Sequence, residues 1–335
     1  RSASFSGRET PRQNFPIMNS TSHGSSTRQR TEVKISPRVA VIVAAYRSDA
    51  TIGRFLESLE AQTYRDFESI VVDSSPDDRT AEVVLDVFPD VTYWHSPERL
   101  FPHAARNEGA RRTSAEILVF TDPDTYARPD WLEQMLRAHD ETGESVVGAI
   151  DCSGRRWLDR GLHISKFSKW LPGRGRRRVD MGPTATLLVR RSDYDAVNGF
   201  SDDLILGDVE FSWTLRAQGR GLVFEPRAVV EHHHLQSFGS FIRERWSRGI
   251  MYGDLRAARR ADGGLELLGW FLVTALPVRF VRNAVLVTIQ CSKASRLLEL
   301  ASTAPVVAAG YAASLGGEAL AYARRLRSMW SPRRT

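Results

Sequence analysis

The chain has 335 residues, 42% of them hydrophobic, with 46 Lys and Arg against 40 Asp and Glu, which gives a net charge of +6. This length suffices for one large domain or two small ones. The near-average composition excludes collagen, wholesale disorder, a disulfide scaffold and a Cys-based zinc or iron–sulfur site. Cys152 and Cys291 lie far apart in the sequence, which favours a reducing compartment. The mild positive charge permits a phosphate-rich ligand or an anionic membrane, and by itself does not indicate nucleic-acid binding.

The sequence divides into three parts. Residues 1–36 are rich in Ser, Thr, Arg and Gln and lack apolar periodicity, so we expect a disordered tail that is not a secretory signal. Residues 37–260 alternate between strand-like and helix-like segments, which indicates one α/β domain. Residues 261–335 are apolar and basic and are predicted to be helical.

Strands and helices alternate along the α/β domain. The β-branched run 39–45 predicts a buried strand, and strand signals recur at 69–73 and 116–121. The helix after the first strand is indicated by one apolar face, formed by Ile52, Phe55, Leu56 and Leu59. The helix after the second strand is indicated in the same way by Ala81, Val84, Leu85 and Phe88. The alternation predicts a Rossmann-like, mixed but mostly parallel sheet flanked by helices, with ligands bound beyond the carboxyl ends of the strands.

Three apolar stretches follow residue 265. They cover 267–278, 284–291 and 300–317, and all fall at or below the length of about 20 strongly apolar residues that a spanning helix needs. We expect helices that lie in or dip into a membrane interface, with headgroup contacts from Arg279, Arg282, Lys293 and Arg296. The alternative is a pair of buried helices that pack on the α/β domain.

Acidic residues follow the predicted strands. Asp122-Pro-Asp124 comes directly after the strand 116–121, and Asp73 ends the strand before it. Two carboxylates at a loop suit Mg²⁺ or Mn²⁺, which a substrate diphosphate also binds, although Asp and Pro also form simple turns. Asp208 opens an amphipathic helix, where a carboxylate is either a helix cap or a general base.

Two further clusters attract attention. His232, His233 and His234 end another strand, and strand alternation puts the first and third on one face, where one of them is a candidate third metal ligand. The Arg-rich segment 173–178 is either a loop that closes on phosphates or reaches a phospholipid-linked acceptor, or a solvated charge run.

In this order the motifs resemble the inverting glycosyltransferases of family 2, which have a GT-A-type nucleotide-sugar-binding fold. The resemblance runs from about residue 39 to residue 246. Val41-Ile-Val-Ala-Ala-Tyr-Arg47 resembles the first strand and turn of the family, which implies donor binding at Ala45 and Tyr46. Val71-Val-Asp-Ser-Ser75 resembles the Val-Asp-Asp-Gly-Ser motif and implies that Asp73 binds the base.

The central motifs of the family follow. Ala105-Arg-Asn-Glu-Gly109 resembles the helix whose Arg and Asn border the donor, which implies that role for Arg106 and Asn107. Asp122-Pro-Asp124 matches the family's Asp-x-Asp, in which Asp124 would chelate the metal and Asp122 would face the ribose and the metal shell.

The downstream motifs complete the resemblance. Gly207-Asp-Val-Glu-Phe211 is similar to the run that carries the catalytic base, which implies this role for Asp208. The strand that ends at His232 resembles the one with the family's downstream histidine, so the resemblance implies His232 as metal ligand, with His234 as second choice. Arg245-Trp246 resembles part of the Gln-x-x-Arg-Trp motif at the donor site of processive members, but Ile242 replaces the glutamine, which argues against a processive polymerase.

The resemblance implies a metal-dependent inverting glycosyltransferase. It would use Mn²⁺ or Mg²⁺ and a nucleotide diphosphate sugar, UDP-linked by preference, to modify an acceptor hydroxyl on a glycan or a lipid-linked molecule. Such an enzyme would serve cell-surface polysaccharide or glycolipid synthesis at the cytoplasmic face of a membrane, peripheral or weakly inserted. A catalytically silent nucleotide-sugar-binding membrane scaffold and a nucleotidyltransferase are the alternatives. A nucleic-acid partner is not expected, because it would leave the acidic crevice unexplained.

Overall fold

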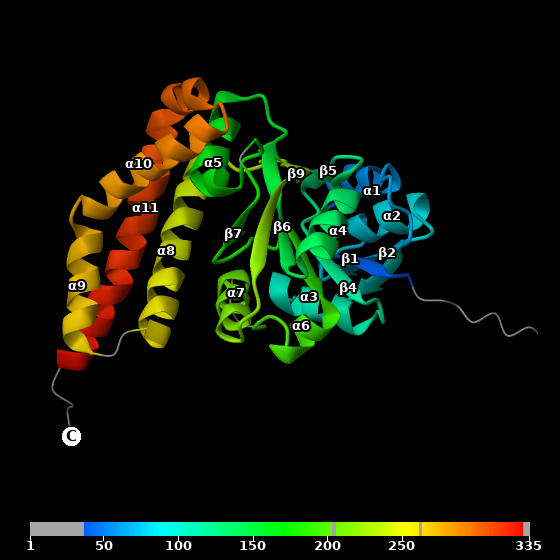
Figure 1. The fold of residues 1–335 in the computed structure, drawn as a ribbon, viewed down its shortest axis with the longest axis horizontal. Coiled ribbons are helices and arrows are strands. Elements are labelled where there is room, and N and C mark those ends of the chain that lie inside the picture. Colours follow the sequence, from blue (N-terminus) through cyan, green and yellow to red (C-terminus); the bar gives the residue numbers. More distant parts are fainter. Residues whose placement is uncertain (1–36, 174, 203–205, 261–262, 331–335) are drawn as a thin grey trace, which may run out of the picture. The chain divides into compact units, whose positions relative to one another are not determined.

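The computed structural model describes residues 37–173, 175–202, 206–260 and 263–330. The predicted disordered tail, 1–36, lies outside these residues. The described strands form one sheet in the order β3-β2-β1-β4-β8-β6-β9-β5, and β7 pairs with β9 beside this path. Figure 1 shows helices packed around this sheet. The predicted α/β fold, a mixed, mostly parallel sheet flanked by helices, is confirmed.

The first half of the sheet is parallel. Its strands are β1 (Val39–Ala45), β2 (Phe67–Asp73), β3 (Thr92–His95) and β4 (Ile117–Thr121). The intervening helices are α1 (Ile52–Glu60), α2 (Arg79–Val87) and α3 (Pro102–Arg111). Every residue of β4 is buried, as expected for a parallel strand with both faces covered.

The two predicted helices differ in how well their apolar faces were identified. In α1 the buried residues are the predicted Ile52, Phe55, Leu56 and Leu59. In α2 the helix is present, but Leu85 is 57% exposed and Thr80 is buried instead. Val84 and Phe88 of the predicted face are buried, so the prediction for α2 is confirmed at these two positions and wrong at Leu85.

The second half of the sheet is mixed. Its strands are β5 (Thr125–Ala127), β6 (Ser145–Cys152), β7 (Arg177–Val179), β8 (Thr186–Arg190) and β9 (Leu222–His232). The helices here are α4 (Trp131–Thr142), α5 (Trp157–Phe167), α6 (Arg191–Ala196) and α7 (Gly207–Ala217), with a short 3₁₀ turn, η1, at Ser168–Trp170. β8 runs antiparallel to β4 and β6, whereas β6 and β9 are parallel.

Four helices complete the chain. They are α8 (Phe238–Arg260), α9 (Gly264–Ala275), α10 (Val278–Lys293) and α11 (Leu297–Trp330), and α11 contacts both α8 and α5 (Figure 1). Glycines allow α8 and α11 to approach closely: a Cβ atom at Gly249 would lie 2.1 Å from the carbonyl oxygen of Ser314, and one at Gly317 would lie 2.2 Å from that of Trp246. The predicted C-terminal helical region is therefore packed on the helix that follows the sheet.

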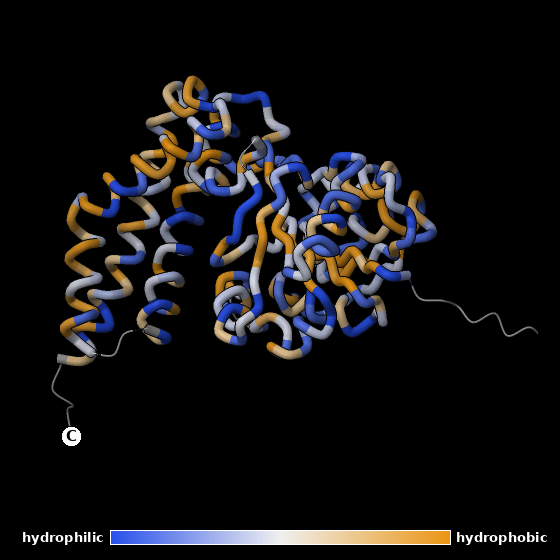
Figure 2. Tube along the Cα trace, viewed as in Figure 1, coloured by the Kyte–Doolittle hydropathy of each residue, from blue (hydrophilic) through white to orange (hydrophobic). Residues whose placement is uncertain are grey.

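An apolar surface remains exposed on α9 and α10. Figure 2 shows hydrophobic residues along both helices, and the exposed ones are Leu265, Leu272, Val273, Leu276, Val278, Val281, Val285, Leu286 and Ile289. We call this the α9–α10 apolar face. Within the described residues no single helix meets the length and hydropathy needed to cross a membrane, but α9 and α10, which are bent by 61°, meet them as a pair.

Only two of the four basic residues predicted to contact headgroups border the α9–α10 apolar face. Arg282 and Lys293 are exposed, as expected for headgroup contacts. Arg279 instead pairs with Glu318 of α11, and Arg296 pairs with Asp151 at 3.0 Å. These two arginines fasten helices to one another and to β6, so the prediction that they face headgroups was wrong.

Candidate active site

A cavity of about 510 Å³ opens at the carboxyl ends of β1, β4 and β9. Its position matches the rule that open α/β sheets bind ligands beyond their strand ends. The wall includes polar residues from both halves of the sheet and from the helices, namely Tyr46, Arg106, Asp122, Asp124, Lys166, Asp208, His232, Arg245 and Arg248. Seven of these nine residues were predicted from the sequence, and His234, the second-choice metal ligand, also lines the cavity, whereas Lys166 and Arg248 were not anticipated.

Arg106 and Asp122 form an ion pair in the floor of the cavity. Arg106 is 4% exposed and comes from α3, which approaches the sheet closely because a Cβ atom at Gly109 would lie 2.5 Å from Ile42. The Asp122 carboxylate accepts a hydrogen bond from the Arg106 guanidinium. This ion pair places a positive charge beside the first aspartate of the Asp-x-Asp motif.

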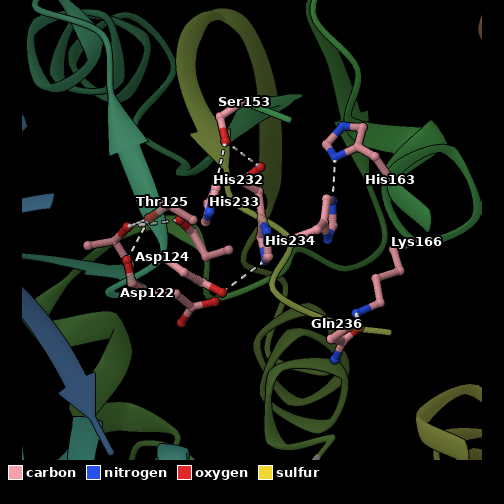
Figure 3. A network of polar contacts seen from close by, with 12 residues as sticks. Asp122, Asp124, Thr125, Ser153, His163, Lys166, His232, His233, His234 and Gln236 are labelled. Carbon is pink, nitrogen blue, oxygen red and sulfur yellow. Dashed lines mark hydrogen bonds and ion pairs between the residues drawn. The ribbon is translucent and has the colours of Figure 1, made fainter. Parts of the chain in front are cut away.

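Asp124 and His232 face one another in the cavity (Figure 3). The Nε2 atom of His232 lies 3.7 Å from the Oδ2 atom of Asp124. Atoms that coordinate one ion are about 3 to 4 Å apart, given metal–ligand bonds of about 2.1 Å. The buried Nδ1 atom of His232 has no hydrogen-bond partner among the described residues. The pair thus has the donor atoms and the separation that a divalent cation requires.

The electrostatics of these two residues also suit a cation. Burial, together with the neighbouring Asp122 carboxylate, raises the pKa of Asp124 to about 7. Burial lowers the pKa of His232 to about 4, which keeps the imidazole neutral and its lone pair available. A positive ion would therefore offset the unfavourable concentration of negative charge at Asp124.

A short strand pair places Asp124 beside His232. In the β5–β9 ladder Thr125 lies opposite His232, and the backbone N–H of His233 donates to the carbonyl of Asp124 at 2.8 Å. Thr125 also closes the Asp122 turn by donating its hydroxyl to the Asp122 carbonyl at 2.7 Å. The strand pair thereby holds Asp124 and His232 side by side, although they are 108 residues apart in the sequence (232 minus 124).

Asp208 occupies the first turn of α7, at the other side of the cavity. Burial raises the pKa of Asp208, and the nearby Arg248 and the N–H of Val209 oppose that shift. The next residue back, Gly207, has room for no side chain, because a Cβ atom there would lie 2.6 Å from the His103 ring. The lack of a side chain at Gly207 thus lets α7 pack closely against α3.

The helix α8 brings two arginines into the cavity. Neither Arg245 nor Arg248 forms an ion pair with a residue that the structure describes, and burial lowers the pKa of Arg245. Beside them Lys166 of α5 pairs with Glu244 at 2.6 Å. Two half-buried cations without an ion-pair partner among the described residues make this wall suited to receive an anionic group of a ligand.

Four predicted donor-binding residues lie outside the cavity lining in the described structure. Asp73 is fully buried and engaged: Ser75 donates to it through its hydroxyl at 2.6 Å, and Tyr93 donates at 2.8 Å. Ala45 is buried in β1, and its neighbour Tyr46 lines the cavity instead. Trp246 directs its ring against α11, near Gly316.

Asn107 is the fourth of these, and its role is to hold a turn. Its side chain donates to the carbonyl of Phe200 at 2.8 Å and accepts from the backbone N–H of Phe200 at 3.0 Å and from the hydroxyl of Tyr194. The turn contains Asn198 and Gly199, which both have positive φ. Asn107 therefore supports the segment that precedes α7 and does not reach the donor cavity.

The three histidines point in different directions, which separates the two candidate metal ligands. His232 faces Asp124, whereas His234 directs its Nε2 atom to His163 at 3.2 Å (Figure 3). The ring of His233 contacts Tyr126. Of the two alternatives, His232 is the one placed to share an ion with Asp124.

The arginines of segment 173–178 that the structure describes are used within the fold. Arg176 pairs with Glu141 and Glu225, and Arg178 pairs with Glu144. Arg177 and Arg178 belong to β7, which pairs with β9. Of the described residues in this segment, only Arg177 and Arg178 belong to the sheet, and none lines the cavity, so of the two alternatives the loop that closes on phosphates is not supported; Arg174 lies outside the described residues.

Sequence reasoning missed Lys166 and Arg248, which line the cavity. Lys166 lies near the end of α5, and no local motif marks it. Arg248 follows Arg245 by one short turn of α8, so the helical spacing of three residues could have paired them.

Comparisons with known proteins identify the class of the protein as a glycosyltransferase. Residues 40–192 match the family model described as Glycosyl transferase family 2. The matched segment is a little under half of the chain, and this segment is similar to the family. The matched segment ends before Asp208 and His232, so it covers the half of the site built by β1 and β4.

Curated relatives agree with this assignment. The chain is 26% identical over 254 residues to the glycosyltransferase AglE of Haloferax volcanii, covering 72% of this chain and 82% of that protein. It is 27% identical to the pre-mycofactocin glycosyltransferase of Mycobacterium tuberculosis, covering 70% of this chain and about half, 52%, of that protein.

Solved structures share the fold. The mannosyltransferase PcManGT of Pyrobaculum calidifontis, in complex with GDP-Man and Mn²⁺, matches with a TM-score of 0.50 and 20% identity, over 81% of this chain and 87% of that one. GalNAc-T7, with UDP, GalNAc and Mn²⁺, matches with a TM-score of 0.50 and 13% identity, over 68% of this chain and 52% of that one. At these identities the likeness concerns the fold alone.

Proposed function

We propose that the protein is a metal-dependent inverting glycosyltransferase that uses a UDP-sugar and modifies an acceptor hydroxyl. The observation that carries this proposal is the meeting of Asp124, His232 and Asp208 around one cavity. A metal-ligand pair on one side and a partly buried carboxylate on the other are the two parts that displacement of a nucleotide diphosphate needs.

Asp208 acts as the general base in this proposal. Its raised pKa makes the carboxylate a better proton acceptor than an exposed aspartate, while Arg248 and Arg106 favour the ionised form that must accept the proton. The acceptor hydroxyl transfers its proton to Asp208 as its oxygen attacks the anomeric carbon from the face opposite the leaving group. The configuration at that carbon is thereby inverted.

Asp124 and His232 would hold Mn²⁺ or Mg²⁺, with Asp122 beside them. The bound ion supplies positive charge that makes the nucleotide diphosphate a better leaving group. Arg106 holds Asp122 in place through their ion pair. Arg245 supplies a second positive charge for the diphosphate from the opposite wall.

A nucleotide-sugar panel tests the reaction. We expect purified protein to release nucleotide diphosphate from a UDP-sugar in the presence of Mn²⁺, and chelation to stop the release. Asp124→Ala should abolish the Mn²⁺ response, whereas Asp86→Asn, on the exposed face of α2, should not change it. Release that is equal with and without chelator would refute the metal site, and release from GDP-mannose in preference to UDP-sugars would refute the donor assignment.

We also propose that the protein binds the surface of an anionic membrane, at its cytoplasmic face, through the α9–α10 apolar face. An exposed apolar patch bordered by Arg282 and Lys293 is suited to the interface between headgroups and acyl chains. A lipid-linked or glycan acceptor would then reach the cavity at that surface.

Vesicle sedimentation tests the membrane proposal. We expect the protein to sediment with vesicles that contain phosphatidylglycerol and Val281→Asp, at 56% exposure, to remain in the supernatant. Leu85→Asp is the matched control, because Leu85 is 57% exposed but lies on α2. Equal sedimentation of the two variants would contradict the role of the α9–α10 apolar face.

A further inference from the structure

A second cluster of metal-ligating side chains lies behind the histidine that faces Asp124. Cys152 ends β6, His163 belongs to α5, and His234 follows β9. Their ligand atoms, one sulfur and two nitrogens, all lie within 4.8 Å of one another. Figure 3 shows the ring of His163 turned toward that of His234 and away from the aspartates.

Hydrogen bonding fixes the state of these imidazoles. The Nε2 atom of His163 contacts the carbonyl oxygen of Ile150 at 3.2 Å, and a carbonyl can only accept, so Nε2 carries the proton and Nδ1 keeps its lone pair. A backbone carbonyl in this role is the usual outer partner of a metal-bound histidine. The Nδ1 atom of His234 is buried and has no hydrogen-bond partner among the described residues.

The distances agree with tetrahedral coordination. The Nδ1 atom of His163 and the Nε2 atom of His234 are 3.2 Å apart. Two nitrogens on one tetrahedral zinc ion are separated by about 3.3 Å, given Zn–N bonds of about 2.0 to 2.1 Å. A hydrogen bond explains the same separation, but it does not explain why the Cys152 thiol lies beside the two imidazoles.

We propose that Cys152, His163 and His234 bind a structural Zn²⁺ ion that is distinct from the catalytic cation. A thiolate with two imidazoles selects zinc over Mg²⁺ and Mn²⁺, which prefer oxygen. On binding, the Cys152 thiol releases its proton to solvent, and the proton on Nε2 of His234 is replaced by one on Nδ1. One cysteine suffices for this set, so the proposal departs from the expectation that two cysteines exclude a Cys-based zinc site.

The ion would fasten three elements together next to the catalytic site. It ties the segment after β9 to α5 and to the end of β6. His232 stacks on His234 with ring centroids 4.5 Å apart, so the fixed His234 ring also sets the position of His232. The zinc site thus supports the cavity without contacting the donor.

Cobalt substitution tests the site on the full chain with its affinity tag removed. We expect about one zinc per chain after expression in zinc-supplemented medium, and a thiolate-to-cobalt charge-transfer band after exchange with Co²⁺. Cys152→Ser should lose the band, whereas Cys291→Ala should retain it. No band in the native protein, or an undiminished band in Cys152→Ser, would overturn the proposal.

Two further measurements keep the result independent of folding and of the proposed reaction. Zinc should raise the melting temperature of the native protein and leave that of Cys152→Ser unchanged, because only a chain that binds the ion is stabilised by it. Asp124→Ala should keep the charge-transfer band, because the band arises from Cys152 in the zinc site and Asp124 belongs to the catalytic cavity. Loss of the band in Asp124→Ala would show that one ion is shared by both clusters and would refute the distinct site.

Discussion

The close contact between α8 and α11 makes Gly249→Ala a sharp test of the packing. A Cβ atom at this position would lie 2.1 Å from the carbonyl oxygen and 2.9 Å from the carbonyl carbon of Ser314. These are backbone atoms of a helix, so no side-chain rotation relieves the overlap. The two helices must separate, and α8 carries Arg245 and Arg248 into the cavity.

The expected loss follows from two opposing terms. Overpacking of this kind costs about 3 kcal/mol, near the upper end of the usual range, because both partners are backbone. Replacing a helical glycine by alanine contributes about 1 kcal/mol in the other direction. We therefore expect the free energy of unfolding to fall by about 2 kcal/mol.

Gly269→Ala provides the matched control. Gly269 lies within α9, and a Cβ atom there meets nothing within 4 Å, so only the propensity gain of about 1 kcal/mol applies. Urea unfolding monitored by tryptophan fluorescence should separate the two variants by about 3 kcal/mol. Equal stability of Gly249→Ala and Gly269→Ala would refute the close packing of α8 on α11.

Three other predictions concern the sheet and the site. Asn107→Ala should lower the free energy of unfolding by about 2 kcal/mol, because it leaves backbone groups of Phe200 unpaired, and should leave the donor Kd from calorimetry nearly unchanged. Burial raises the pKa of Glu225, but hydrogen bonds from Arg227 and Arg176 outweigh it and hold the pKa below 4.5. The stabilisation by Glu225 is therefore complete above pH 4.5 and is lost as the pH falls through the pKa of Glu225 in the folded protein. Between pH 7 and pH 3 the free energy of unfolding from denaturation curves should thus fall less for Glu225→Gln than for the native protein. Asp208→Asn should reduce kcat at least 100-fold with little effect on the donor Kd, and an equal loss of both would contradict its assignment as base.

The first half of the sheet was predictable because its signals are local. The runs 39–45 and 116–121 are apolar and β-branched, and α1 buries the face that its periodicity indicates. The Asp-x-Asp motif was located correctly, since a loop after a parallel strand must open at the ligand-binding edge.

Contacts between distant segments were not predictable. Asp73 ends a strand as expected, but the hydroxyl of Tyr93 in β3 donates a hydrogen bond to its Oδ2 atom. No local sequence pattern predicts this contact. Asn107 was predicted to border the nucleotide-sugar donor because it lies in the Ala105–Gly109 motif, but its side-chain amide donates a hydrogen bond to Phe200, 93 residues away. The direction of the His234 ring likewise depends on His163, which only the tertiary structure brings near.

The pairing of β5 with β9 determines when the site can form during synthesis. β5 lies directly after the Asp-x-Asp turn, and its strand partner in the described sheet is β9, which begins at residue 222. The parallel strands β1 to β4 can associate once residue 121 has left the ribosome, but the partner that aligns Asp124 is translated about a hundred residues later. A nascent chain can therefore form the parallel half of its sheet well before β9 is available to align Asp124 with His232.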